Sequence, residues 1–210
     1  MTDSATNAIL MNLDYFYFYC GTGSGNSICS LVGNSLGENR AKVARNYAFM
    51  GFIFICVISI LLGILLIVFK QFAGNFFTSD ESILTNFNSH IIFATSAMIF
   101  DSIQSGTNRI LAGMGYQKYA SIVILIIYFP IMVPAAYFLK SIMGLKGIWI
   151  PYLFTFLIIS IFESIIIFLT DYFKLASKIT IYNKNLKQEV MENQKPDKEM
   201  ELLRNQPQNF

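Results

Sequence analysis

Four polar side chains recur at helical spacing inside an otherwise apolar stretch near the middle of the chain. They are Asp101, Gln104, Ser105 and Asn108, which occupy positions i, i+3, i+4 and i+7. On a helix, residues with this spacing share one face. An aspartate at the centre of a membrane span costs about 2.5–3.5 kcal/mol, so its presence there indicates a functional site. We predict that this face looks into a helix bundle or a water-filled cavity, with Asp101 as its functional group.

A simpler structure explains part of the same pattern. Gln104, Ser105 and Asn108 also fit a hydrogen-bonded seam between two helices, which accounts less well for Asp101. That aspartate can instead lie near a helix end or pair with Arg109, which follows two turns later.

The composition places this face in a membrane protein. Of the 210 residues, 54% are hydrophobic and 13% are charged, whereas a soluble domain carries about a quarter of charged residues. The net charge of +2 and the scattered basic residues exclude a nucleic-acid partner. A single histidine and three cysteines in apolar or small-residue stretches predict no metal site. We also find no nucleophile–base pair and no cofactor motif, so we expect neither an enzyme nor a bound cofactor.

Five membrane-spanning helices are predicted, over residues 9–36, 46–69, 82–111, 119–139 and 148–170. About 20 apolar residues cross the hydrocarbon core of a bilayer. The fold class is therefore an all-α integral membrane protein, with its transmembrane region in residues 1–173. Residues 174–210 are rich in lysine, glutamate, asparagine and glutamine, and predict a cytoplasmic, mostly disordered polar tail.

Small residues run along the first predicted span. The glycines of this stripe are spaced by multiples of four residues: Gly21, Gly25, Gly33 and Gly37. Such a stripe lets a neighbouring helix backbone approach closely. The segment GTGSGN within it is no nucleotide-binding loop, because the third glycine, a Lys-Ser/Thr pair and a preceding strand are all missing. Asn12 and Asp14, near the start of the span, are predicted to lie on its polar side and line the cavity.

The fourth and fifth predicted spans each carry residues that disturb an apolar helix. Pro130 and Pro134 remove backbone hydrogen bonds in the fourth span and predict a kink. Trp149 and Tyr152 at the start of the fifth span are predicted to anchor it at the membrane interface. Glu163, the one acid of that span, is either buried or extends to the interface.

The basic residues predict the orientation of the spans. With five spans, one side of the membrane collects most of the positive charge, in Arg40, Lys42, Arg45, Lys118, Lys174 and Lys178. The positive-inside rule places this side, and the C-terminus, in the cytoplasm. The N-terminus is then outside, which for an odd number of spans without a signal peptide predicts that further helices precede it.

Four motifs in order resemble one transporter family. Val32–Gly37 (VGNSLG), followed by ENRAKVAR, resembles the VGNxLG signature of multidrug and toxic compound extrusion (MATE) transporters. Phe100–Gln104 and Ile110–Lys118 resemble a later span of the family, in which an acid precedes LRGxGxQ. Pro134 and the GLKGIW of Gly144–Trp149 resemble its last two spans. The resemblance extends from about residue 5 to residue 172.

The resemblance implies a fold of twelve helices in two lobes of six, which exchanges a proton or sodium ion for an organic, often cationic, substrate. This chain corresponds to helices eight to twelve, the C-terminal lobe without its first helix. Asp101 falls where the family places an acid involved in cation or proton coupling. In the mechanism that we expect, Gln104, Ser105 and Asn108 contribute hydrogen bonds beside Asp101. Aromatic faces for a cation are expected from those of Tyr15, Tyr17 and Tyr19 that look inward. Ala112 departs from the family, which usually has arginine at that position.

The implied function is that of a secondary antiporter, or a fragment of one, which exports organic cations or other xenobiotics. Its expected partners are the lipid bilayer, a small organic substrate and the missing N-terminal lobe. The expected location is the plasma membrane or a vacuolar or endosomal membrane. The alternatives are a flippase or exporter of a lipid-linked or amphipathic substrate, and a membrane fragment that does not transport.

Overall fold

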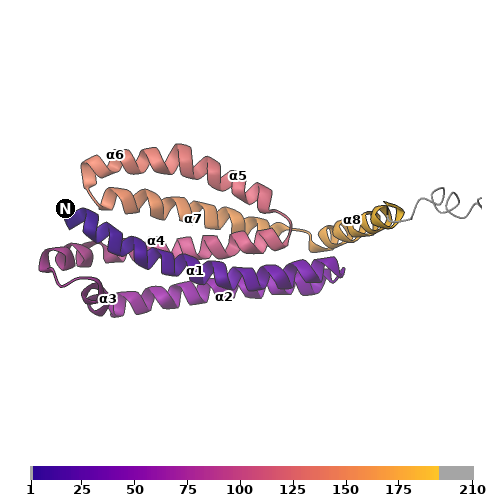
Figure 1. Ribbon diagram of the computed structural model, residues 1–210, viewed down its shortest axis with the longest axis horizontal. Helices are drawn as coiled ribbons and strands as arrows, with labels where there is room; N and C mark the ends of the chain where they lie inside the picture. The colour runs from indigo at the N-terminus through magenta and orange to yellow at the C-terminus, as the bar shows by residue number, and fades with distance from the viewer. Residues whose placement is uncertain (1, 194–210) are drawn as a thin grey trace, which may run out of the picture.

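Helices account for nearly all of residues 2–193, which the computed structural model describes. Five long helical segments lie side by side along one axis (Figure 1). In chain order they are α1 (Thr2–Gly37), α2 (Ala41–Val68), α4 (Glu81–Gly113), the pair α5 (Gln117–Ile127) and α6 (Val133–Met143), and α7 (Lys146–Leu169). A short helix, α3 (Lys70–Phe77), follows α2, and α8 (Tyr172–Asn193) follows α7. The all-helical fold class predicted from the sequence is confirmed.

Four of these segments are long and apolar enough to cross a membrane, namely α2, α4, the α5–α6 segment and α7. α1 fails on hydropathy because glycine, serine, threonine and asparagine fill its second half. Its 36 residues nevertheless give a helix about 54 Å long, which packs along α4 and α2. α1 is thus the fifth long helix of the bundle, and its contacts with α4 and α2 place it there although it is less apolar than the other four segments. Where the membrane boundaries lie along each helix stays a prediction.

α4 is the central helix and contacts α1, α2 and α7. It approaches α1 closely because small residues face each other. A Cβ on Gly21 would overlap the Ser102 carbonyl oxygen, and a Cβ on Gly25 would lie 2.7 Å from the Gly106 carbonyl oxygen. These two glycines therefore act as the sequence pattern indicated. The packing at Gly33 is looser, since a Cβ there would lie 3.5 Å from the Gly113 carbonyl oxygen. A Cβ on Gly37 would meet no atom within 4 Å, so the packing role predicted for Gly37 is not seen.

The two prolines predicted to cause a kink lie at the junction of α5 and α6. Pro130 falls inside a single π-helical turn, Tyr128–Met132, which widens the helix where the backbone hydrogen bond is lost. Pro134 follows near the start of α6, directly after that π-helical turn. The segment passes through both as one continuous span (Figure 1).

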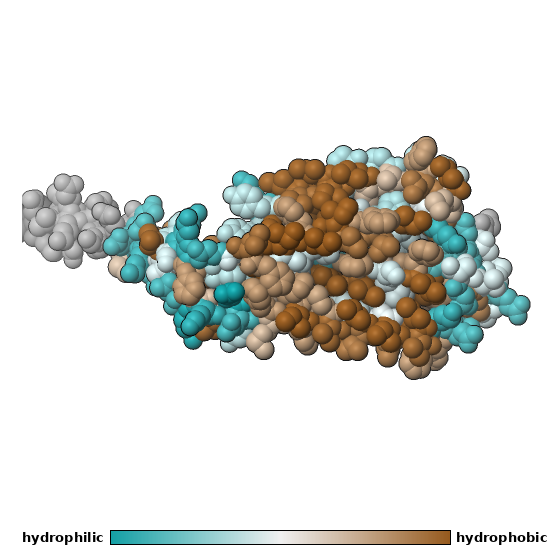
Figure 2. All heavy atoms as spheres, turned by 180° about the vertical axis from the view of Figure 1, so that it is seen from behind, coloured by the Kyte–Doolittle hydropathy of each residue, from teal (hydrophilic) through white to brown (hydrophobic). Residues whose placement is uncertain are grey.

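Polar groups gather at the two ends of the bundle, and apolar side chains cover the face between them (Figure 2). At one end, the Asp80 carboxylate caps α4 by accepting hydrogen bonds from the Ser82 and Ile83 amides. Its hydrogen bonds with the Ser82 hydroxyl and amide hold the pKa of this exposed carboxyl below its usual value. The apolar band between polar ends is the surface that a bilayer requires.

The polar segment after the last span begins with a helix. α8 continues to Asn193 because the Asp171 carboxylate caps its first turn, and because Tyr172 and Ala176 are buried against the bundle. α8 thus covers the first part of the tail predicted from residue 174, and the extent of disorder in that tail stays a prediction. Residues 194–210 of the predicted tail lie outside the described residues.

Candidate functional site

A cavity of about 420 Å³ lies between α1, α4, α5 and α7. Asp101 from α4 and Asp14 from α1 both line it, and each side chain is only 4% exposed. The cavity therefore brings together two acidic side chains that lie 87 positions apart in the sequence (101 − 14). A polar cavity inside an apolar bundle is the arrangement expected of an ion or substrate pathway.

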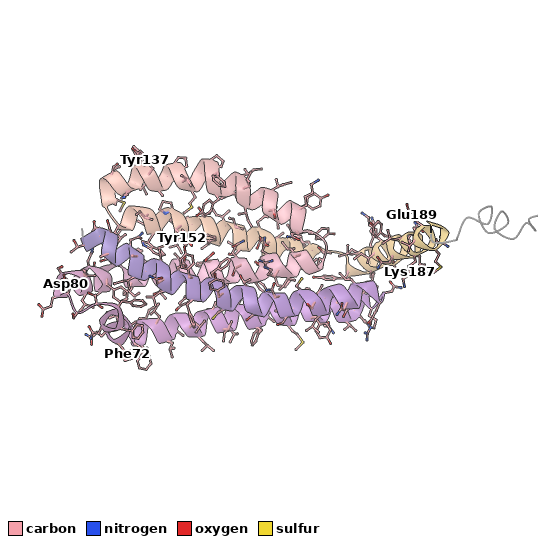
Figure 3. All side chains as sticks on the ribbon, in the orientation of Figure 1. Phe72, Asp80, Tyr137, Tyr152, Lys187 and Glu189 are labelled. Atoms are coloured by element: carbon pink, nitrogen blue, oxygen red, sulfur yellow. The ribbon has the colours of Figure 1, made fainter. Side chains whose placement is uncertain are left out.

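The Asp14 carboxylate has one bonded and one free oxygen. The Tyr152 hydroxyl of α7 donates to Oδ2 over 2.6 Å, and Tyr152 lies between α7 and α1 (Figure 3). Oδ1 is buried and has no hydrogen-bond partner in the described part of the chain. A buried acceptor without a donor is costly, so this oxygen favours a proton or a cationic ligand in the cavity.

Asp101 is not neutralised by a neighbouring base. Arg109 lines the same cavity, yet within residues 2–193 no ion pair joins it to either aspartate. The structural explanation left open by the sequence, a pair between Asp101 and Arg109, is therefore not what the structure shows. Both cavity carboxyl groups are available to a ligand.

The other predicted residues of α4 also reach the cavity. Gln104, Ser105 and Asn108 all line it, as their helical spacing from Asp101 indicated. The Ser105 hydroxyl lies 3.0 Å from the Ser102 carbonyl oxygen and 3.3 Å from the Phe18 carbonyl oxygen, so it also helps to join α4 to α1. The polar face of α4 is thus both a cavity wall and a packing surface.

α1 meets the prediction only in part. Asn12 does not line the cavity, because it is exposed and donates instead to the Ala8 carbonyl oxygen of its own helix over 2.9 Å. Asn12 and Asp14 are two positions apart, and residues at that spacing do not share a helix face. Tyr15 and Tyr19 do line the cavity, whereas Tyr17 is buried among apolar side chains away from it.

A second polar cluster lies between α4 and α7, and sequence reasoning undervalued it. Glu163 is completely buried. Its Oε2 accepts from the Thr107 hydroxyl over 2.6 Å, and its Oε1 accepts from the Asn108 amide over 3.1 Å. Of the two predictions left open for this glutamate, the buried one is right.

The aromatic residues at the start of α7 face inward and are not interfacial anchors. Trp149 is 1% exposed and donates to the Asn7 side-chain oxygen over 3.2 Å. Tyr152 holds Asp14, as described above. A sequence signal for this existed: Tyr152, Phe156, Ile159 and Glu163 follow a helical repeat, so they share one face of α7. A face that carries Glu163 points to the bundle interior.

The arrangement can bind a cation. Two carboxyl groups supply negative charge, and within residues 2–193 neither forms an ion pair, although Arg109 lines the same cavity. Tyr15 and Tyr19 place aromatic rings there too. Ring faces attract cations, and burial strengthens the attraction between a carboxylate and a cation. Among the described residues no cluster of three metal-ligating side chains occurs.

Known proteins resemble this chain in sequence. The sequence model of the MatE family matches residues 3–138. Human multidrug and toxin extrusion protein 2 is 25% identical over 152 residues, and Arabidopsis thaliana protein DETOXIFICATION 26 is 26% identical over 139 residues. The matched parts cover 71% and 65% of this chain, but only 25% and 27% of those proteins. A probable multidrug resistance protein NorM of Pasteurella multocida is 23% identical over 70% of this chain and 33% of its own length.

A solved structure has the same fold. The crystal structure of the eukaryotic MATE transporter AtDTX14 matches 86% of this chain with a TM-score of 0.80, at 21% identity, and the match covers 41% of that transporter. The chain thus has the architecture of part of one transporter lobe. Because the family's sequence model covers well over half of its residues, this chain, an integral membrane protein, belongs to the MatE family.

Proposed function

We propose that this chain forms the cation-binding part of a secondary antiporter that exchanges an organic cation for a proton. The observation that carries the proposal is the cavity that Asp14 and Asp101 share without a basic partner. Burial favours the neutral form of a carboxyl group, and a bound cation favours its ionised form. A proton and an organic cation then compete for the same negative charge, which is the simplest form of antiport.

Asp101 is the exchange group in this proposal, and its neighbours orient the substrate. Gln104, Ser105 and Asn108 supply hydrogen bonds from α4, and Asp14 supplies a second negative charge from α1. No further cofactor takes part. The chain spans about a quarter of the length of the first relatives it matches, and we propose that it works with the remaining helices of such a transporter.

The proposed location is a cell-surface or vacuolar or endosomal membrane, with the C-terminus in the cytoplasm. Support comes from charge: Arg40 in the α1–α2 connection and Lys42 and Arg45 in the first turns of α2 lie at the same end of the bundle as α8 (Figure 1). Asp80 and Glu81 lie at the other end. Positive loops favour the cytoplasmic side.

An equilibrium binding experiment tests the proposal. The protein is reconstituted in lipid nanodiscs, and the affinity for tetraphenylphosphonium is measured at neutral pH. Asp101→Asn keeps the shape of the side chain but removes the charge, so we expect at least tenfold weaker binding, as one lost charge interaction of about 1.4 kcal/mol implies. Asp80→Asn serves as the matched control. It changes an exposed carboxyl group that caps the start of α4 and does not line the cavity, so it should leave the affinity unchanged. Full affinity in the Asp101→Asn protein would remove Asp101 from the proposal.

A further inference from the structure

Glu163 is a buried carboxyl group that is hydrogen-bonded to an amide side chain of the cavity lining. Glu163 does not line the cavity, whereas Asn108, to which it is bonded, does. We propose that Glu163 is a positioning residue: it holds the Asn108 amide with its oxygen toward the cavity, and so makes the site prefer organic cations that carry an N–H group. This inference rests on the proposed function, since it concerns the substrate class of the same cavity.

The geometry fixes the amide through its donor end. An asparagine side chain has an NH₂ group at one end and a carbonyl oxygen at the other. Asn108 Nδ2 donates to Glu163 Oε1 over 3.1 Å. Asn108 also lines the cavity, which Glu163 does not, so we infer that the end presented to the cavity is the acceptor, Oδ1.

The orientation of the amide holds in both protonation states of the glutamate. An ionised carboxylate accepts at both oxygens, from Asn108 and from the Thr107 hydroxyl. A neutral carboxyl group carries its proton on Oε2 and donates it to Thr107 Oγ1, which in turn donates to the Ile103 carbonyl oxygen at 3.0 Å. Oε1 remains an acceptor for Asn108 in either case.

The consequence for a ligand is chemical selectivity. The cavity offers the carboxyl groups of Asp14 and Asp101 together with the Asn108 oxygen, and all of them are hydrogen-bond acceptors when the acids are ionised. A protonated amine can donate an N–H to the Asn108 oxygen. A quaternary ammonium ion of similar size has the same charge but no N–H donor, so it forms no N–H hydrogen bond with this oxygen.

The test compares two matched probes in nanodiscs at neutral pH: a protonated N,N-dimethyl-naphthylmethylamine and its N-methylated quaternary analogue. Their naphthyl fluorescence reports binding, and the measured quantity is the ratio of the two affinities. Glu163→Met removes the acceptor that holds Asn108, and we expect the ratio to fall about tenfold against the protonated amine, the loss of one hydrogen bond to a charged group. Glu163→Gln should keep the ratio, because its carbonyl oxygen still accepts from Asn108 while its NH₂ group donates to Thr107.

Asn108→Leu provides a second variant at a half-buried position, in case the methionine variant does not fold. It should lower the ratio as much as Glu163→Met, and the double variant should lower it no further. An equal loss of both probes, or an unchanged ratio, in Glu163→Met would overturn the inference, and so would a glutamine variant that behaves like the methionine one. Failure of the wild-type protein to bind either probe would instead defeat the proposed function itself.

Discussion

At the scale of single residues, the two acids of the cavity differ in how the protein holds them. Asp14 is held by the Tyr152 hydroxyl across 138 positions of sequence. The Asp101 side chain has no hydrogen-bond partner among the described residues. We infer that Asp101 is the exchangeable charge of the site, since the Tyr152 hydroxyl already stabilises one oxygen of Asp14 and leaves only the other free for a ligand.

The role of Tyr152 predicts a loss of stability. Tyr152→Phe leaves both oxygens of the buried Asp14 without a donor, and leaving such a group unpaired costs about 1–3 kcal/mol. The free energy of unfolding in mixed micelles, measured by titration with sodium dodecyl sulfate, should fall by that amount. Tyr137→Phe is the control, because Tyr137 is 84% exposed and points away from the bundle (Figure 3). Equal stability of the two variants would show that Asp14 does not depend on Tyr152.

The spacing of the polar face of α4 was sufficient to predict four of the cavity residues. Asp101, Gln104, Ser105 and Asn108 share one face of one helix, and a local pattern reveals such a set. A local sequence pattern cannot predict which residues of other helices these side chains contact. Tyr152 looked like an interfacial aromatic, and Glu163 looked ambiguous, because their partners Asp14 and Asn108 come from distant segments.

At the scale of the elements, the contact between α1 and α4 positions the site. Gly21 and Gly25 let the two backbones meet about two and three turns beyond Asp14, beside Ser102 and Gly106. This close approach holds Asp101 of α4 against α1, so that it lines the same cavity as Asp14. The sequence predicted the glycine stripe but not where its packing role ends. Gly37 continues the spacing, yet a Cβ on it would meet no atom within 4 Å, because α1 has by then reached the turn into α2.

A pair of alanine substitutions tests this contact. In Gly25→Ala the new Cβ would lie 2.7 Å from the Gly106 carbonyl oxygen and 2.8 Å from Arg109 Cβ, so the helices must separate, at a cost of about 1–3 kcal/mol. In Gly23→Ala, two residues away on the same helix, the new Cβ meets no atom within 4 Å, and the change should stabilise α1 by about 0.5–1 kcal/mol. The same micelle titration compares them. A Gly25→Ala protein as stable as Gly23→Ala would mean that α1 and α4 are not tightly packed.

At the scale of the whole molecule, alternate connections lie at opposite ends of the bundle (Figure 1). The sequence predicted this arrangement well, since long apolar runs and the charges between them determine spans and ends. It predicted α1 from the stripe of small residues and the polar side of that segment, and not from hydropathy. The length of α8 was not predicted; the Asp171 cap and the burial of Tyr172 stabilise the start of that helix.

The proposed orientation predicts a labelling pattern. In a background where Cys20, Cys29 and Cys56 are serine, single cysteines replace Ser79 and Lys118, which are exposed at opposite ends of the bundle. A membrane-impermeant maleimide added to the side opposite the cytoplasm should label Ser79→Cys and leave Lys118→Cys unlabelled until the membrane is permeabilised. The reverse pattern would contradict the orientation drawn from charge.

The central claim is that a proton and an organic cation compete for the Asp101 carboxyl group. The most direct test follows the nanodisc titration with tetraphenylphosphonium by a pH electrode, in weakly buffered solution free of sodium, and counts the protons released per cation bound. The account predicts a release that approaches about one proton per cation in the wild-type protein and no such release in Asp101→Asn. Cation binding to the wild-type protein without proton release would contradict it.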